Sequence, residues 1–335
     1  YKFQYNNARL ILKTENDPTL YKNGVFKMKT QKKWLEAILF IAPCLIMIVV
    51  FVYYPLITNF VYSTQKFSAF SQEKIFIGFE NFKSLFSDKV VVTALLNNIR
   101  YAVISIIIQV GFGLVLAAVL EDRAFRRVAT LFRTTFFLPV LISMTVICLL
   151  FQFIYHPQIG LLNNFLDLVG LDSLTRQWLG SSKTAIYAVI AMSQWQSTGY
   201  ICMLFIVSIQ KIPEDLYEAC EIDGANKIQR FLHITFPQVR EMFFVTMVTT
   251  TIGAFTVFNE PYILTKGGGP GTSSITMAVH MYQSAFVRDQ MGYASTVATV
   301  IFIICAVLAA VQMGAFGNDL SDAKKKRRFG RRSKI

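Results

Sequence analysis

Six stretches of the chain are long and apolar enough to cross a lipid bilayer. They are predicted at about 36–57, 101–121, 134–154, 185–208, 242–264 and 293–314. A membrane helix needs roughly 20 mainly apolar residues, because every backbone polar group in hydrocarbon must be paired within the segment. Only 16% of the residues are charged, against roughly 25% in soluble domains. The chain is therefore predicted to be an all-α polytopic membrane protein. Pro139 weakens the third stretch, and a polar end weakens the fifth.

Residues 34–315 are predicted to form one transmembrane domain between two tails, at 1–33 and 316–335. Met28 and the basic residues after it resemble a natural start for a membrane protein, so residues 1–27 are expected to carry little function. The second tail contains eight lysines and arginines. Next to a membrane span, such a tail favours contact with lipid or a cytoplasmic location over nucleic-acid binding.

The distribution of lysine and arginine predicts the orientation of the spans. Loops 122–133 and 209–241 each hold four basic residues, whereas loops 155–184 and 265–292 each hold two. Loop 58–100 holds five but is much longer. Because basic residues favour the cytoplasmic side, both termini are predicted to be cytoplasmic.

One polar segment between the fourth and fifth spans is typical of a helix, a glycine turn and a second helix. Pro213 suits a first helical position, and Glu214 and Asp215 follow near the positive end of the helix dipole. Gly224 can adopt the left-handed conformation that ends a helix. Pro237 is expected to end the second helix, because the residue before a proline avoids helical angles. By the charge distribution, this pair is cytoplasmic.

Motifs for nucleotide binding and hydrolytic chemistry are missing from the sequence. It contains no GxxxxGK[ST], GxSxG or HExxH pattern. The Gly-rich segment 266–274 lacks the lysine of a phosphate-binding loop and is interpreted as an outer turn. The five cysteines and three histidines have no metal-ligand spacing. We therefore expect no catalytic residue, no metal and no cofactor bound by this chain.

Polar side chains within the fourth and fifth spans are candidates for a transport path. Such groups are costly in hydrocarbon unless they are paired or face a wet cavity. For single residues, contact between helices is an equally good interpretation. The mixture of aromatic and amide groups at 193–200 favours binding, since it suits sugar rings. For Glu260, an interfacial position is weighed slightly above ligand contact. The predicted path residues are Ser193, Gln194, Trp195, Gln196, Ser197, Tyr200, Gly253, Thr256, Asn259 and Glu260.

The polar segment resembles the EAA loop of ABC importer permeases. The sequence Glu218-Ala219-Cys220, followed by Gly224 and Pro237, fits Glu-Ala-Ala, three residues, Gly, and an apolar stretch ending in Pro. Cys220 replaces the second alanine. A proline often found shortly after Pro237 is replaced by Val-Arg.

Three further pieces resemble the family of the maltose-transporter MalF subunit. They are Gly-Phe-Glu-Asn-Phe at 78–82, the turn at 264–270, and the segment at 282–286 that precedes Met-Gly-Tyr-Ala-Ser at 291–295. With the EAA-like loop they cover most of residues 34–315 in the expected order. The resemblance implies a type I ABC importer permease fold with six transmembrane helices and a cytoplasmic coupling helix pair at 213–236.

The resemblance also implies roles and partners. The coupling helix would dock in a cleft of a cytosolic ATPase, with Glu218 as the polar contact, Gly224 as the turn, and Ala219 and Ala225 beside them. By similarity, 193–200 and the segment from Gly253 lie where the maltose permease contacts sugar, although several side chains differ, so maltose itself is not expected. The implied partners are a second related permease, two ABC ATPase subunits that bind ATP and Mg, an external solute-binding protein and a sugar, expected to be an oligosaccharide. The alternatives are another solute, such as glycerol phosphate, and a membrane enzyme.

Overall fold

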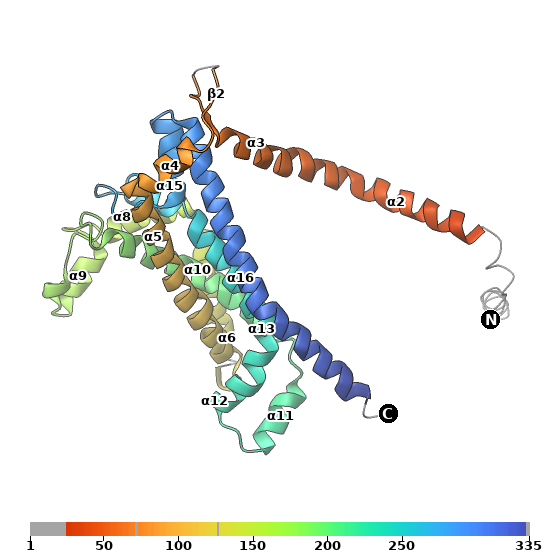
Figure 1. The fold of residues 1–335 in the computed structure, drawn as a ribbon. Helices are drawn as coiled ribbons and strands as arrows, with labels where there is room; N and C mark the ends of the chain where they lie inside the picture. Colours follow the sequence, from red (N-terminus) through yellow and green to blue (C-terminus); the bar gives the residue numbers. More distant parts are fainter. Residues whose placement is uncertain (1–24, 71–72, 126, 333–335) are drawn as a thin grey trace. The chain divides into compact units, whose positions relative to one another are not determined.

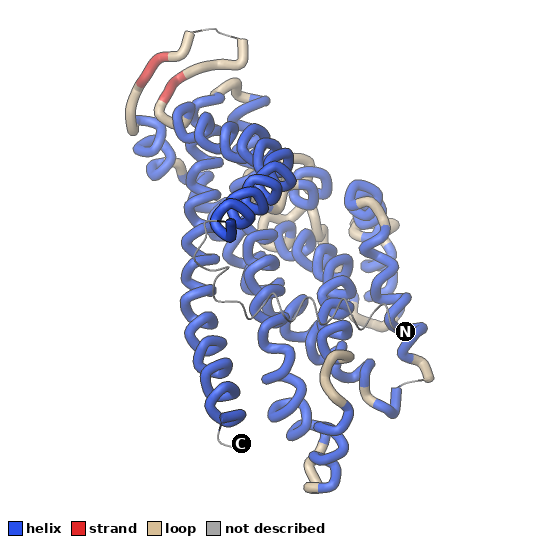
Figure 2. The backbone as a smooth tube through the Cα atoms, turned by 90° about the vertical axis from the view of Figure 1, so that its right-hand side faces the viewer, coloured by secondary structure: helices blue, strands red, loops and turns tan. Residues whose placement is uncertain are grey.

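The computed structural model describes residues 25–70, 73–125 and 127–332, and these are mostly helical (Figure 2). Most of the predicted first tail, residues 1–24, lies outside the described residues, as do residues 333–335. The chain divides into two units, residues 1–59 and 60–335. The first unit contains α2 (Val25–Ile48), the π-helical segment η1 (Val49–Tyr53) and most of α3 (Tyr54–Tyr62), which follow one another without a break. This continuous helix contains the first predicted span.

The second unit begins with a short hairpin and a long helical rod. The strand β1 (Gln65–Lys66) pairs antiparallel with β2 (Ile75–Phe76), with Gln65 opposite Phe76. After α4 (Glu80–Ser87), the rod consists of α5 (Lys89–Ser105), η2 (Ile106–Phe112) and α6 (Gly113–Glu121). Asp88 caps the rod, since its carboxylate accepts the Val90 N–H at 2.8 Å. The helix therefore begins well before residue 101, where the apolar stretch begins.

The third predicted span is not one straight helix but two helical segments with a sharp bend near Pro139. After η3 (Arg123–Phe125), α7 (Ala129–Phe137) leads into the 3-10 turn η4 (Leu138–Leu141), and α8 (Met144–Ile154) follows at a bend of 100°. Pro139 lies in η4 and cannot donate a backbone hydrogen bond, and Ile142 is extended. The proline and the extended residue explain the break.

The fourth predicted span is the helix α10 (Ala185–Ile209), which follows α9 (Leu161–Leu168) and η5 (Asp172–Leu174). The apolar side chains of α10 contribute to two of the unit's buried clusters. Four helical segments of the described chain, Glu36–Tyr62, Lys89–Glu121, Lys227–Leu264 and Met291–Ala315, meet the length and hydropathy expected of a span, and a fifth does if the bent pair is one span. The helix α10 is not among them, because its polar run lowers its hydropathy.

The polar helix pair leads directly into the next span. It comprises α11 (Glu214–Ile222) and α12 (Lys227–Arg230), and then the π-helical segment η6 (Phe231–Thr235) and α13 (Phe236–Thr256) continue without a break. The prediction that Pro237 ends the second helix was therefore wrong. A proline lacks the N–H and clashes with the carbonyl four residues earlier. The wider π-helical turn shifts the bonding pattern by one residue immediately before it. The fifth predicted span is interrupted after Thr256 and resumes as α14 (Asn259–Leu264).

The last elements are α15 (Met277–Tyr282), η7 (Gln283–Val287) and α16 (Met291–Arg332). The helix α16 continues beyond the predicted span end at 314, so residues 316–332 are helical. It packs against α13 and α15, while α13 also packs against α5. Within the second unit, Figure 1 shows α11 and α12 together at one end, called here the helix-pair end, and α4 and α15 at the other.

Candidate functional site

The helix pair has the turn that the sequence predicts. The helix α11 starts directly after Pro213, which is therefore the N-cap and not the first helical residue as predicted. Glu214 and Asp215 occupy the first turn, where the helix dipole favours negative charge. Gly224 has φ +76°, so the prediction of a left-handed glycine is confirmed.

The second helix of the pair is capped and held against the first. Asn226 and Gln229 form a capping box, in which each side chain accepts the other residue's backbone N–H, at 2.8 and 2.9 Å. The Tyr217 hydroxyl lies 3.0 Å from the Thr235 hydroxyl. Arg230 forms an ion pair with Glu221. The two helices therefore present one ordered surface.

The four predicted coupling residues lie on this surface. Glu218, Ala219 and Gly224 are exposed, and Ala225 is half-buried. Ile222 and Ile228, on either side of the glycine turn, are 87% and 70% exposed. An exposed apolar patch rimmed by polar residues marks a surface that another protein covers.

The side chain of Glu218 also contacts this chain itself, which the sequence did not indicate. Glu214, Glu218 and Glu221 follow helical spacing, so they lie on one face of α11. Arg123 faces all three, with N–O distances of 2.8, 3.4 and 3.8 Å. These carboxylates raise the pKa of Arg123, Glu214 most strongly. The spacing of the acidic residues was a signal for a basic partner, but not for which arginine.

Asp122, the residue before Arg123, contacts basic side chains of the second helix of the pair. Its carboxylate lies 3.1 Å from Lys227 Nζ and 3.5 Å from Arg230 Nη2, and it accepts the Ala124 N–H at 2.9 Å. Burial by itself raises the pKa of Asp122, but the Ala124 amide and the two cations outweigh it, so the pKa is lowered. The carboxylate is therefore ionised at neutral pH.

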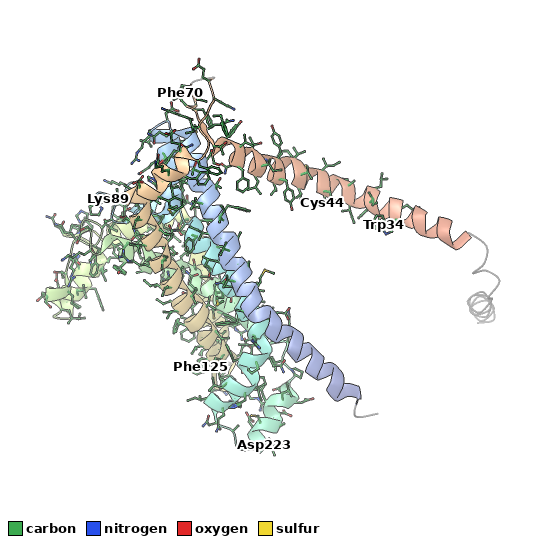
Figure 3. The ribbon with its side chains drawn as sticks, viewed as in Figure 1. Trp34, Cys44, Phe70, Lys89, Phe125 and Asp223 are labelled. Carbon is green, nitrogen blue, oxygen red and sulfur yellow. The ribbon has the colours of Figure 1, made fainter. Side chains whose placement is uncertain are left out.

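A cavity of about 750 Å³ lies between α6 and the helix pair. Its lining includes Val115 and Val119 of α6, Tyr217 of α11 and Phe231 of η6, with Asp122 also on its wall. Figure 3 labels Phe125 and Asp223 at the helix-pair end, which this cavity occupies. Phe231, on the wall of the cavity, also packs against the apolar cluster that contains Leu114 and Leu120 of α6.

The predicted path residues of α10 divide between two faces. Ser193, Gln194 and Gln196 are buried, and the Gln194 amide donates to the Ser105 hydroxyl at 3.1 Å. Trp195 and Tyr200 are about half exposed, at 51% and 47%, whereas Ser197 is intermediate. The Trp195 ring lies 5.4 Å from the Phe151 ring. The structure thus separates the aromatic groups from the amides with which the sequence grouped them.

The predicted path residues of the fifth span lie on an open face. Gly253, Thr256 and Asn259 are exposed, and Glu260 is half-buried. The Tyr101 hydroxyl lies 3.4 Å from Glu260 Oε1 and also interacts with Ser193. Tyr101, which the sequence analysis missed, therefore brings Glu260 and Ser193 to one place. Among the residues described, no group of three His, Cys, Asp or Glu side chains could hold a metal ion.

Comparison with known proteins identifies close relatives. The family model described as "Binding-protein-dependent transport system inner membrane component" matches residues 109–321. The probable ABC transporter permease protein YurN of Bacillus subtilis is 58% identical over 83% of this chain and 94% of its own length. The lactose transport system permease protein LacF of Rhizobium radiobacter is 33% identical over 83% of this chain and 92% of its own length.

One solved structure has the same fold. It is the crystal structure of a bacterial ABC transporter involved in the import of the acidic polysaccharide alginate. It matches with a TM-score of 0.73 at 22% identity and covers 88% of this chain and 98% of its own. The predicted type of permease fold is confirmed at this level.

Proposed function

The chain belongs to the family of binding-protein-dependent transport system inner membrane components, and on that premise we propose that it is the permease subunit of a bacterial ABC importer for a sugar. The family match identifies the chain as a multi-pass transport subunit and not an enzyme. The helix pair is the observation that supports the importer role. Its exposed apolar side chains and its continuous connection to α13 suit docking of a cytosolic ABC ATPase.

The architecture that we propose counts α10 and the bent pair α7–α8 as spans, giving six transmembrane helices in a domain at 34–315 between the two tails. Residues 213–236 are the cytoplasmic coupling helices, and both termini are cytoplasmic. The basic residues of loops 122–133 and 209–241 support this orientation. The basic tail contacts lipid and not nucleic acid.

The partners that we propose are a second related permease, two ABC ATPase subunits and an external solute-binding protein. The family description names dependence on a binding protein. A related solved structure is of the alginate transporter in complex with a periplasmic protein bound to an alginate pentasaccharide. ATP and Mg belong to the ATPase, because the chain has no phosphate-binding loop.

The substrate that we propose is a sugar without acidic groups, with an oligosaccharide favoured. The relatives include proteins named for lactose, arabinooligosaccharides and starch degradation products. Trp195 and Tyr200 offer exposed aromatic faces that suit sugar rings. A phosphate ester needs cationic partners, and residues 185–209 and 242–264 contain no lysine or arginine.

The mechanism that we propose is alternating access driven by the ATPase. Closure of the ATPase displaces α11 and α12. Because α12, η6 and α13 form one continuous helical segment, the displacement reaches Gly253 and Thr256 of the path without an intervening loop. The chain performs no covalent chemistry.

The double variant Glu218→Ala, Gly224→Val is expected to uncouple ATP hydrolysis from uptake. Loss of the Glu218 carboxylate removes the proposed polar contact with the ATPase. Valine at position 224, where φ is +76°, costs roughly 1–2 kcal/mol at the turn. The purified complex with its ATPase and binding protein, reconstituted in vesicles, should hydrolyse ATP while sugar uptake per ATP falls by about 10-fold or more. Normal coupled uptake would reject the role of the pair.

A matched control lies in the loop predicted to be outside. Asp167→Ala, Gly170→Val removes a carboxylate from α9 and places valine at a glycine that also has φ +76°, with no atom within 4 Å of an added Cβ, as at Gly224. This variant should keep normal coupling. Failure of the wild-type chain to co-purify with any ATPase would instead reject the proposed ATPase partners.

Replacing Trp195 with alanine is expected to weaken sugar entry without affecting assembly. An aromatic contact of this kind contributes roughly 0.5–1.5 kcal/mol, so the half-saturation concentration for uptake should rise by about 2- to 10-fold. The comparison is Tyr187→Ala, which removes an aromatic side chain of similar exposure, 49%, from the same helix. Equal effects of the two substitutions would remove Trp195 from the path.

A further inference from the structure

The structure assigns Asp122 and Arg123 a positioning role: we propose that they form an ionic tether that links the coupling helix pair to α6. Displacement of the pair would then reach the second span through this tether, as well as the fifth span through α13. This inference rests on the proposed function, because it concerns how the same helix pair acts.

The two residues carry opposite charges and bind different helices of the pair. Arg123 contacts the acidic face of α11 through Glu214, Glu218 and Glu221. Asp122 contacts Lys227 and Arg230 of α12. Because Asp122 and Arg123 are adjacent in the chain and form ion pairs with different helices, the end of α6 is attached to both α11 and α12.

The Arg123 contacts suit a connection that changes during a cycle. The Arg123 side chain is 58% exposed, and exposed ion pairs are worth little individually, roughly 0–1 kcal/mol. Three carboxylates share one guanidinium, so an ATPase that takes Glu218 as its polar contact leaves Glu214 and Glu221 in place. The arginine keeps its hold on α11 while Glu218 exchanges partners.

The Asp122 contacts are better shielded from water. The side chains of Asp122 and Arg230 are only 17% and 18% exposed. Arg230 also pairs with Glu221 of α11, which closes a ring of charges around the pair. We therefore expect the contacts of Asp122 to persist while those of Arg123 change.

The tether continues into the membrane-spanning helices. Asp122 directly follows the last residue of α6, Glu121, which forms an ion pair with Arg133 of α7 and accepts a hydrogen bond from Gln210 at 3.3 Å. Further along, α6 packs closely on α10, where a Cβ at Gly113 would lie 3.6 Å from Ile201 Cγ2. A shift of Asp122 therefore moves α6 together with its neighbours.

The ion pairs of the tether lie on the wall of the cavity. A space of about 750 Å³ separates the apolar faces of α6 and the pair. Apolar packing joins Phe231 of η6 to the cluster that includes Leu114 and Leu120 of α6, but across the cavity itself atoms that are not in contact exert little force on each other. The ion pairs at its edge connect the two sides directly.

The test compares Arg123→Glu with Arg127→Glu in the whole importer in vesicles. Both substitutions reverse one charge of the same loop, so any effect on membrane orientation is shared. Among the described residues, no hydrogen bond or ion pair involves the Arg127 side chain. Arg123→Glu faces three carboxylates, and we expect the ratio of sugar uptake to ATP hydrolysis to fall by about 5- to 10-fold. Arg127→Glu should leave this ratio unchanged.

A compensating substitution separates positioning from loss of structure. Adding Glu214→Arg to Arg123→Glu restores an attractive pair and should recover at least half of the lost ratio. If Arg123→Glu fails to assemble, Arg123→Gln, which removes the attraction without repulsion, should show the same direction of change. An unchanged ratio in the assembled Arg123 variants, or no recovery in the double variant, would overturn the tether. Absence of coupled uptake in the wild type would instead overturn the proposed function.

Discussion

Replacement of Gly199 with leucine is expected to prevent the chain from folding into a stable, extractable form. At Gly199, α10 passes so close to η4 and the end of α7 that an added Cβ would overlap the carbonyl oxygen of Phe136. A backbone carbonyl cannot rotate away as a side chain can. Overpacking of a well-packed core costs typically 1–3 kcal/mol, and more against backbone, which is a large share of a total stability of roughly 5–15 kcal/mol. The measurement is the yield and thermal midpoint of monodisperse protein in detergent.

Gly314→Leu provides the control for this substitution. Gly314 lies in α16, and no atom lies within 4 Å of the Cβ that leucine would add. Its yield and thermal midpoint should match those of the wild type. A Gly199→Leu protein as stable as Gly314→Leu would show that the close approach of α7 and α10 is not required.

Asn98→Leu is expected to produce the second large loss of stability. The fully buried Asn98 amide donates to the Ala254 carbonyl at 2.6 Å and accepts the Met277 N–H at 2.9 Å. It therefore links α5 to α13 and α15. Leucine has a similar volume but leaves both backbone groups unpaired, at about 1–3 kcal/mol each. The thermal midpoint of the purified protein should fall by several degrees.

The control for Asn98 is Asn164→Leu. Asn164 is exposed on α9, so its replacement leaves no buried group without a partner. Substitutions of this kind usually change stability by less than about 0.5 kcal/mol. If both variants melted at the same temperature, the two hydrogen bonds of Asn98 would not be a major source of stability.

Hydropathy located the helices well but not their ends. The apolar stretches lie on helices, although the third and the fifth are each divided between two, because the need to pair backbone groups in hydrocarbon acts locally along the chain. The first twelve residues of α5, from Lys89 to Arg100, lie outside the predicted span because Lys89, Asn97, Asn98 and Arg100 interrupt their apolar side chains, although the helix includes them. The effects of prolines also depended on context. Pro139 breaks a helix, whereas Pro237 follows a π-helical turn and does not.

The site was predictable where its geometry is local. The left-handed Gly224 follows from the chain itself, since only a glycine turns so readily. Arg123 and Tyr101 were missed because their contacts with Glu218 and Glu260 join residues far apart in sequence. Helical spacing separates Trp195 from Gln194 and Gln196 around α10, but the sequence alone does not say which side is buried. The structure identifies Trp195 on the open side.

The uninterrupted helix from Lys227 to Thr256 gives the chain the geometry of a lever. At 1.5 Å per residue, its 30 residues (256 − 227 + 1) span about 45 Å, more than the hydrocarbon core of about 30 Å. A tilt of about 10° at one end would move the other by about 8 Å over that length. A tilt driven from the helix-pair end would stop at Val257, where the helix ends and the backbone is extended. A bifunctional spin label across this joint would report the pivot directly.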